Sequence, residues 1–109
     1  MTVLLENPKM ISRMTELLVE AACPKRIILF GSHARGDATE EGDLDVMVVE
    51  ESVSDRLREM VRLSRLLRPL GLALDLLVVS EEKFSYWRDT PGNVYFEAAS
   101  EGKVLYEAA

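Results

Sequence analysis

Apolar residues recur at helical spacing near the N-terminus of the chain and then gather into a short continuous run. Over residues 8–22 the spacing predicts an amphipathic helix, with Asn7 as its N-cap and Pro8 at its first position. Pro24 ends this helix, and the β-rich run over residues 26–30 predicts a strand. The N-terminal part therefore predicts one helix followed by one strand.

Two later apolar runs, residues 44–49 and 72–79, have the length of strands rather than of helices. The first of these runs is apolar at almost every position, which predicts burial on both faces of a sheet. Between the first two strands, the glycine-containing residues 31–42 predict a loop with one helical turn.

A second amphipathic helix is expected to end near Leu67, where Pro69 and Gly71 break the pattern. Its expected start is capped by Ser52 or Ser54 together with Asp55. The face predicted to be buried consists of Val53, Leu57, Met60, Val61, Ser64 and Leu67.

The C-terminal third predicts two short helices separated by a turn over residues 90–92. Residues 80–82 resemble a helix start with acidic residues in the first turn, and the last helix covers about residues 93–100, before Gly102 and a tail. This order of elements predicts an α/β (α+β) fold, a small mixed sheet of about three to four strands with helices packed on it. With 109 residues, the chain is expected to form a single domain, residues 1–109.

Composition narrows the classes of function. The single cysteine, Cys23, excludes an intramolecular disulfide, and it is expected to be a small buried residue. The single histidine, His33, leaves no Cys/His zinc set, and we expect it to be a loop residue rather than a catalytic one. No apolar run has the length of a signal peptide or a membrane span, so a cytoplasmic protein without a membrane partner is expected.

The formal net charge of −6 argues against general nucleic-acid binding, which is typical of basic proteins. Two explanations of the acidic balance stay open. The carboxylates either gather to hold cations, or they form an acidic surface that keeps the protein in solution.

A glycine-containing loop, Gly31-Ser32-His33-Ala34-Arg35-Gly36, follows the first predicted strand directly. Glycine allows the backbone to turn sharply and to approach a ligand. Ser32 can offer a hydroxyl and N–H groups to a phosphate, and Arg35 can add a charge-assisted contact. The alternative is an ordinary turn after a strand.

Three aspartates lie on the later strands. Asp43 and Asp45 are two apart, so they share one face of the second strand, where hard oxygen ligands favour Mg²⁺ or Mn²⁺. Asp75 lies within the apolar third strand, where an unpaired charge is costly to bury. Asp43 alternatively only caps a turn, and Asp75 alternatively forms a buried salt bridge with Arg26.

Together these residues resemble the DNA polymerase β-type nucleotidyltransferase superfamily, and within it the minimal nucleotidyltransferases of the MntA-like antitoxin branch. The matching pattern is Gly31-Ser32-x-Ala34-Arg35-Gly36, then Asp43-x-Asp45, then Asp75, within residues 26–79. A weaker similarity covers residues 102–107. The residue before the first acid is often Ser in this family, and here it is Gly42.

The resemblance implies the nucleotidyltransferase fold and a site for ATP or another nucleoside triphosphate. By that resemblance Gly31 and Ser32, with Arg35, hold the triphosphate. Asp43, Asp45 and Asp75 are the catalytic residues and the ligands of two ions, Mg²⁺ or Mn²⁺. The implied reaction is nucleotidyl transfer, with AMP from ATP as the expected group and an attack on the α-phosphorus.

The resemblance also implies a partner, a HEPN-type toxin that is adenylylated on a tyrosine. The alternatives are a non-catalytic antitoxin or nucleotide-binding module that acts by contact, and transfer to a small molecule; self-association into a homo-oligomer also stays open. Two surfaces are candidates for a partner. One is the arginine-rich side of residues 56–68, otherwise a solvated helix face, and the other is an aromatic cluster with Tyr86 and Trp87, if it is exposed.

Overall fold

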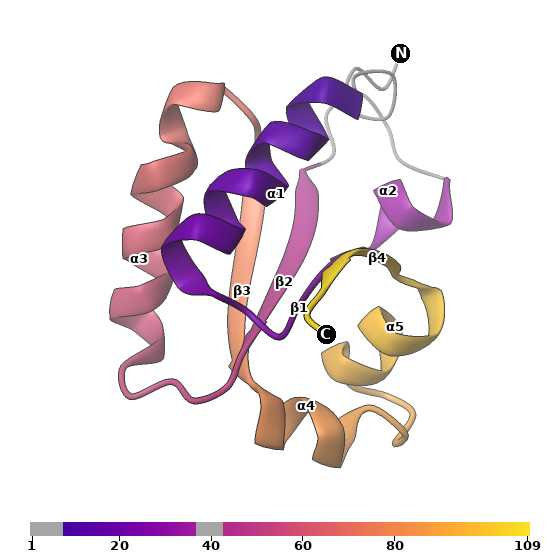
Figure 1. Cartoon of the computed structure of the whole chain (residues 1–109). Coiled ribbons are helices and arrows are strands. Elements are labelled where there is room, and N and C mark those ends of the chain that lie inside the picture. The colour runs from indigo at the N-terminus through magenta and orange to yellow at the C-terminus, as the bar shows by residue number, and fades with distance from the viewer. Residues whose placement is uncertain (1–7, 37–42) are drawn as a thin grey trace.

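The computed structural model describes residues 8–36 and 43–109. In chain order, its elements are α1 (Pro8–Ala22), β1 (Arg26–Phe30), α2 (Ser32–Arg35), β2 (Leu44–Glu50), α3 (Arg56–Leu67), η1 (Arg68–Leu70), β3 (Leu74–Ser80), α4 (Glu81–Trp87), α5 (Val94–Glu101) and β4 (Lys103–Glu107). Figure 1 shows α1 and α3 side by side along the strands, with α4 at the lower end of the strands and α5 below α2.

The strands form one mixed sheet in the order β3-β2-β1-β4. β1 is antiparallel to both of its neighbours, β2 and β4, whereas β2 and β3 are parallel. A parallel pair needs a crossover connection, and α3 supplies it between β2 and β3. The fold class predicted from the sequence, a small mixed sheet with helices packed on it, is confirmed.

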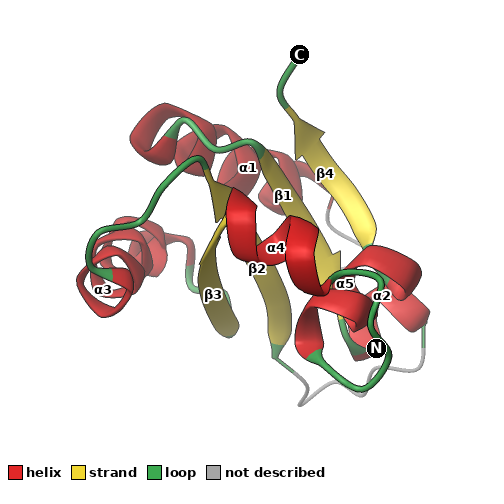
Figure 2. Cartoon of the chain, turned by 90° about the horizontal axis from the view of Figure 1, so that it is seen from below, coloured by secondary structure: helices red, strands yellow, loops and turns green. Residues whose placement is uncertain are grey.

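Alternating side chains divide the core into two layers, one on each face of the sheet. On one face, apolar residues of α1 and α3 pack against Ile27, Val46 and Val48. On the other face, Phe84 of α4 and Ala98 of α5 pack against alternate strand positions such as Met47. Figure 2 shows α4 in front of the strands and α1 behind them.

Side-chain caps fix the starts of three helices. Asp55 accepts a hydrogen bond from the Arg58 N–H at 3.0 Å at the start of α3. Ser80 caps α4 and Asn93 caps α5 in the same way. The helix predicted over residues 8–22 is confirmed from Pro8 onward, and Asn7 lies outside the described residues.

Two predicted boundaries differ from the structure. The third strand begins at Leu74 rather than at residue 72, after a helical turn that Gly71 ends in the left-handed conformation. The C-terminal tail is a strand, β4, because β1 offers it an unpaired edge. In the expected loop, residues 32–35 form the single helical turn, while residues 37–42 lie outside the described residues.

The prediction of which face of α3 is buried is wrong in part. Leu57 is 72% exposed and Val61 is 44% exposed, whereas Leu63 and Leu67 are buried. The reason is that α3 packs in the angle between α1 and the sheet, so its buried stripe runs through residues 63 and 67.

The prediction that Cys23 is buried is also wrong. Cys23 is exposed, and its φ of 45° places it in the left-handed region at the end of α1. Its role is to turn the chain away from the helix before Pro24, which is itself buried.

One polar cluster, partly exposed, links α3 to β2 and α1. Arg62 of α3 donates to the Glu59 carboxylate at 2.8 Å and to the Ala21 carbonyl of α1 at 3.0 Å. Glu50, at the end of β2, faces this pair. Burial, followed by the hydrogen bond to Glu59, raises the pKa of Glu50 to about 8. The raised pKa favours the protonated form of Glu50 beside the Glu59 carboxylate.

Among the described helices, none combines the length and the apolar character that crossing a bilayer requires.

Candidate active site

Three strands bring the predicted site residues to one end of the sheet. β1 ends at Phe30, which lies opposite Asp45 near the start of β2. Because β2 and β3 are parallel, Asp45 lies directly beside Asp75 of β3. In a sheet, such neighbours are about 5 Å apart and point to the same face. Two of the three predicted acids thus lie side by side next to the Gly31 loop.

Gly31 is the residue that lets the loop lie against the acids. It is buried, and its φ of 74° is in the left-handed region. A Cβ atom at this position would overlap the Oδ2 atom of Asp45. Glycine is therefore needed for two separate reasons, the backbone conformation and the missing side chain.

The Asp45 carboxyl group is crowded by other acids. Burial raises its pKa, and the nearby charges of Asp75, Glu97 and Asp43 raise it further, while His33 acts in the opposite direction. A carboxyl group surrounded in this way is more stable with a cation beside it. This electrostatic pattern is what a metal-binding or phosphate-transfer site requires.

Asp75 does not form a salt bridge with Arg26, which was the alternative to a role in metal binding. Arg26 pairs with Glu81 at 3.3 Å and with Glu107 at 3.5 Å, at the opposite end of the sheet. The expectation that Asp75 is buried is wrong, because β3 is an edge strand and Asp75 is exposed near its start. Asp75 is thus available to a ligand.

The helical turn α2 uses much of the loop's own hydrogen-bonding capacity. The N–H groups of Ala34 and Arg35 donate to the Gly31 carbonyl at 3.1 Å, and the Gly36 N–H donates to the Ser32 backbone carbonyl at 2.9 Å. Within the described residues, the Ser32 hydroxyl makes no hydrogen bond. If this loop holds a phosphate, Ser32 is the residue with capacity to spare.

Arg35 is held by α5. Its guanidinium lies 3.5 Å from Glu101 and 3.9 Å from Glu97. To contact a phosphate as predicted, Arg35 must share or leave these carboxylates. The charge of Glu97 also raises the pKa of Asp45. The sequence interpretation missed Glu97, because no motif marks it and only the packing of α5 on the sheet brings it to the site.

His33 is not solvated, since it is only 2% exposed. It packs within α2, and its charge lowers the pKa of Asp45. This placement agrees with a residue that supports the loop.

The donor set fits a magnesium ion that is completed by its substrate. Within residues 8–36 and 43–109, no three His, Cys, Asp or Glu side chains converge to hold a metal on their own. Asp45 and Asp75 provide an adjacent pair, and Mg²⁺ in nucleotide sites is commonly held by one or two carboxylates plus phosphates and waters. Asp43 is exposed beside this pair, and its part in a three-carboxylate set stays a prediction.

Comparisons with known proteins identify the family of this chain. The family model described as "Nucleotidyltransferase domain" matches residues 11–104. Two proteins of Methanocaldococcus jannaschii named "Putative protein adenylyltransferase" are similar in sequence. MJ0604 is 38% identical over 75% of this chain and 78% of its own length, and MJ1379 is 37% identical over 71% and 79%.

Solved structures share the fold. A "putative nucleotidyltransferase from Sulfolobus solfataricus" superposes with a TM-score of 0.67 at 18% identity, covering 94% of this chain and 82% of that one. A "toxin-antitoxin with AMP-PNP" superposes with a TM-score of 0.61 at 20% identity, covering 89% and 73%. With a family match over most of its length and the acid pair beside its glycine loop, this chain belongs to the nucleotidyltransferase domain family.

Proposed function

We infer that this nucleotidyltransferase transfers AMP from ATP to a hydroxyl group of a protein partner, in a reaction that depends on Mg²⁺ or Mn²⁺. The observation that carries this proposal is the pairing of Asp45 with Asp75 against the Gly31 loop. Support for a protein acceptor comes from the relatives named as protein adenylyltransferases.

The chain's own residues have distinct tasks in this reaction. Ser32 would bind the triphosphate, together with Arg35 once its guanidinium turns from the carboxylates of α5. Asp45 and Asp75, with Asp43 beside them, would hold the cations. When bound, the metal ions supply a lowered pKa of the acceptor hydroxyl and charge compensation for the leaving pyrophosphate. The acceptor oxygen bonds to the α-phosphorus, and the bond from this phosphorus to the bridging oxygen breaks. Pyrophosphate leaves with the electron pair, and the hydroxyl proton passes to solvent.

The partner is proposed to be a HEPN-type toxin, for which this chain is the antitoxin. Two structural neighbours are toxin–antitoxin complexes, one crystallised with AMP-PNP and one a mutant of MntA-HpeT.

The test uses ATP labelled at either the α- or the γ-phosphate, incubated with Mg²⁺, the purified protein and a purified HEPN-type protein as the candidate acceptor. Label from the α-position is expected on the partner, and label from the γ-position is not. Asp75→Asn is expected to slow transfer by about a hundredfold or more, because it removes a charge beside Asp45. Asp89→Asn, on the exposed turn after α4, is the matched control and should transfer normally.

The outcomes separate the alternatives. Loss of transfer in Asp75→Asn with unchanged co-purification of the partner supports the enzyme. Partner binding without any transfer by the parent protein identifies a contact antitoxin. Transfer of label only to small molecules of a cell extract contradicts a protein acceptor.

A further inference from the structure

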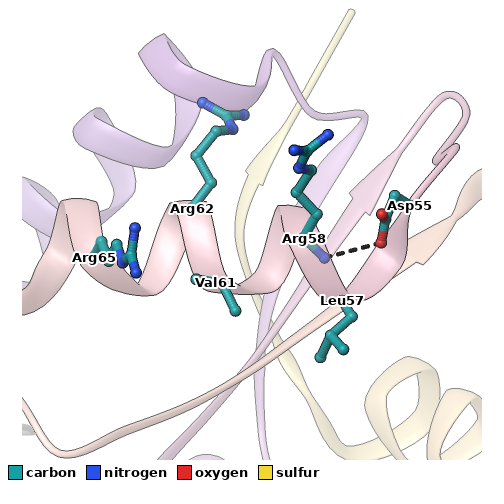
Figure 3. Close-up of a pocket in the computed structure, with 6 residues that line it drawn as sticks. All are labelled: Asp55, Leu57, Arg58, Val61, Arg62 and Arg65. Carbon is teal, nitrogen blue, oxygen red and sulfur yellow. Dashed lines mark hydrogen bonds between the residues drawn. The ribbon is translucent and has the colours of Figure 1, made fainter.

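The outward face of α3 combines exposed apolar residues with arginines around a surface hollow. The hollow has a volume of about 690 Å³ and is lined by Asp55, Leu57, Arg58, Val61, Arg62 and Arg65. Figure 3 shows Leu57 and Val61 along one edge of the helix and Arg58 and Arg62 along the other. We refer to these six residues as the α3 face.

The arginines of the α3 face are not equivalent. Arg62 is committed to the fold, because it binds Glu59 at 2.8 Å and the Ala21 carbonyl at 3.0 Å. Arg58 and Arg65 make no ion pair with any residue that the structure describes. They lie two helical turns apart on the same side, so the helix presents two uncompensated guanidinium groups in a protein whose net charge is −6.

The apolar residues of the α3 face are not part of the core. Leu63 and Leu67 fill that role, whereas Leu57 is 72% exposed and Val61 is 44% exposed. Single exposed apolar residues are ordinary on protein surfaces. Here two of them lie one turn apart beside a hollow, and the arginines run along the neighbouring side of the same helix, so an apolar stripe and a basic stripe lie next to each other.

We propose that the α3 face binds an acidic amphipathic helix of a partner protein. Apolar side chains of that helix occupy the hollow over Leu57 and Val61, and its Asp or Glu residues pair with Arg58 and Arg65. Charge complementarity selects this partner, because an acidic helix is attracted to the two guanidinium groups although the rest of the molecule is acidic. Nucleic acid fits less well, since one edge of the surface is formed by the exposed apolar pair and the net charge is negative.

This interaction lies on the opposite layer from the chemistry. α3 packs on the face of the sheet that carries the Val46 and Val48 side chains, whereas Asp45 projects to the face covered by α4 and α5. A protein held at the α3 face therefore leaves the Asp45 and Asp75 carboxylates open. The proposal does not depend on the transfer reaction and can fail or succeed without it.

The test selects binders from two displayed libraries of amphipathic helical peptides, one with Glu and Asp opposite the apolar positions and one with Lys and Arg there. We expect enrichment from the acidic library only. Binding of the enriched peptides should weaken at least tenfold in the double variant Arg58→Glu/Arg65→Glu, and also in Leu57→Ser. It should weaken further as the salt concentration rises.

Arg13→Glu on α1 is the matched control, because Arg13 is exposed and pairs only with its neighbour Glu16 among the described residues. Its peptide binding should equal that of the parent protein. All of the substituted side chains are exposed, and circular dichroism checks that each variant is folded. The proposal is overturned if no acidic peptide is enriched, if basic peptides are preferred, or if the double variant binds equally well. It is also overturned if RNA or DNA duplexes bind through Arg58 and Arg65 more tightly than the peptides do.

Discussion

Residue 31 is a glycine, and because it has no side chain, the candidate phosphate loop can lie directly against the acid pair. Gly31 carries φ of 74°, and the position of its absent Cβ is filled by the Asp45 carboxylate. Gly71 has a similar φ of 69° but has open space around it. Replacing each of these two glycines by alanine therefore separates the energetic cost of the backbone conformation from the cost of a steric overlap.

Gly31→Ala is expected to lower the free energy of unfolding by about 2–4 kcal/mol, more than Gly71→Ala, for which about 1 kcal/mol is expected. Urea unfolding measures both values. In an Asp45→Ala background the overlap is removed, so the cost of Gly31→Ala should fall to that of Gly71→Ala. Equal costs of the two glycine substitutions in the parent protein would contradict the close approach of Gly31 to Asp45.

The elements were predictable to different degrees. The helix over residues 8–22 and the strand over residues 26–30 follow from local spacing, and the structure has both with the same bounds. The buried side of α3 was not predictable, because Leu57 and Val61 fit the helical spacing as well as Leu63 and Leu67 do. Only tertiary packing decides between two apolar stripes on one helix.

Prediction of the site from the sequence has the same limit, as the acid pair shows. The motif that resembles a known family selected the aspartates, but the adjacency of Asp45 and Asp75 depends on the parallel register of two strands separated by α3. Glu97 and its contact with Arg35 depend on where α5 docks, which no local pattern encodes. Residue identities at the site were thus predictable, while the neighbours that tune them were not.

The junction between α5 and β4 also depends on a glycine, because a side chain at residue 102 would not fit there. A Cβ atom on Gly102 would overlap the Ala98 carbonyl oxygen and the Cγ2 atom of Ile28. The backbone of Gly102 is ordinary, with φ of −76°, so space alone demands glycine there. Its role is to let the helix end directly against β1.

Gly102→Ala should therefore destabilise the protein by about 1–3 kcal/mol, because either α5 or β4 must move away from β1. Thermal unfolding measures the loss. Gly36→Ala gives the comparison, because its Cβ would meet nothing within 4 Å and only the strain of its left-handed φ of 85° would destabilise it. An unchanged unfolding midpoint in Gly102→Ala would show that this junction is loosely packed.

On the scale of the whole molecule, pH acts on stability through the carboxyl pair between β2 and α3. Glu50 has a pKa of about 8 in the fold against an ordinary value of 4.5, chiefly because it is buried. Its stabilising contribution is present below pH 4.5 and is lost as the pH rises through about 8. The pKa of Glu59 is lowered, mainly by its hydrogen bond from Arg62, so its contribution is present above pH 4.5 and is lost as the pH falls.

We expect the parent protein to lose about 1–2 kcal/mol of unfolding free energy between pH 5 and pH 8 relative to Glu50→Gln, after allowance for solvent near the pair. The amide keeps a donor for Glu59 but does not ionise. Urea unfolding across this range measures the difference, with Glu82→Gln, an exposed site at the start of α4, as the control. If the curves of the parent and Glu50→Gln run parallel, Glu50 does not titrate in this window.

The pairing of β4 with β1 also affects the order in which the elements fold. Arg26 lies opposite Glu107, so this pairing closes a loop that contains nearly all of the other elements. Closing a loop of that length costs roughly 4 kcal/mol of chain entropy, and few contacts are gained until the strands meet. β1 and β2 are much closer in sequence, so they can pair early, and β4 is expected to join last. During synthesis, the edge of β1 beside the Gly31 loop therefore stays open until the final strand has been made.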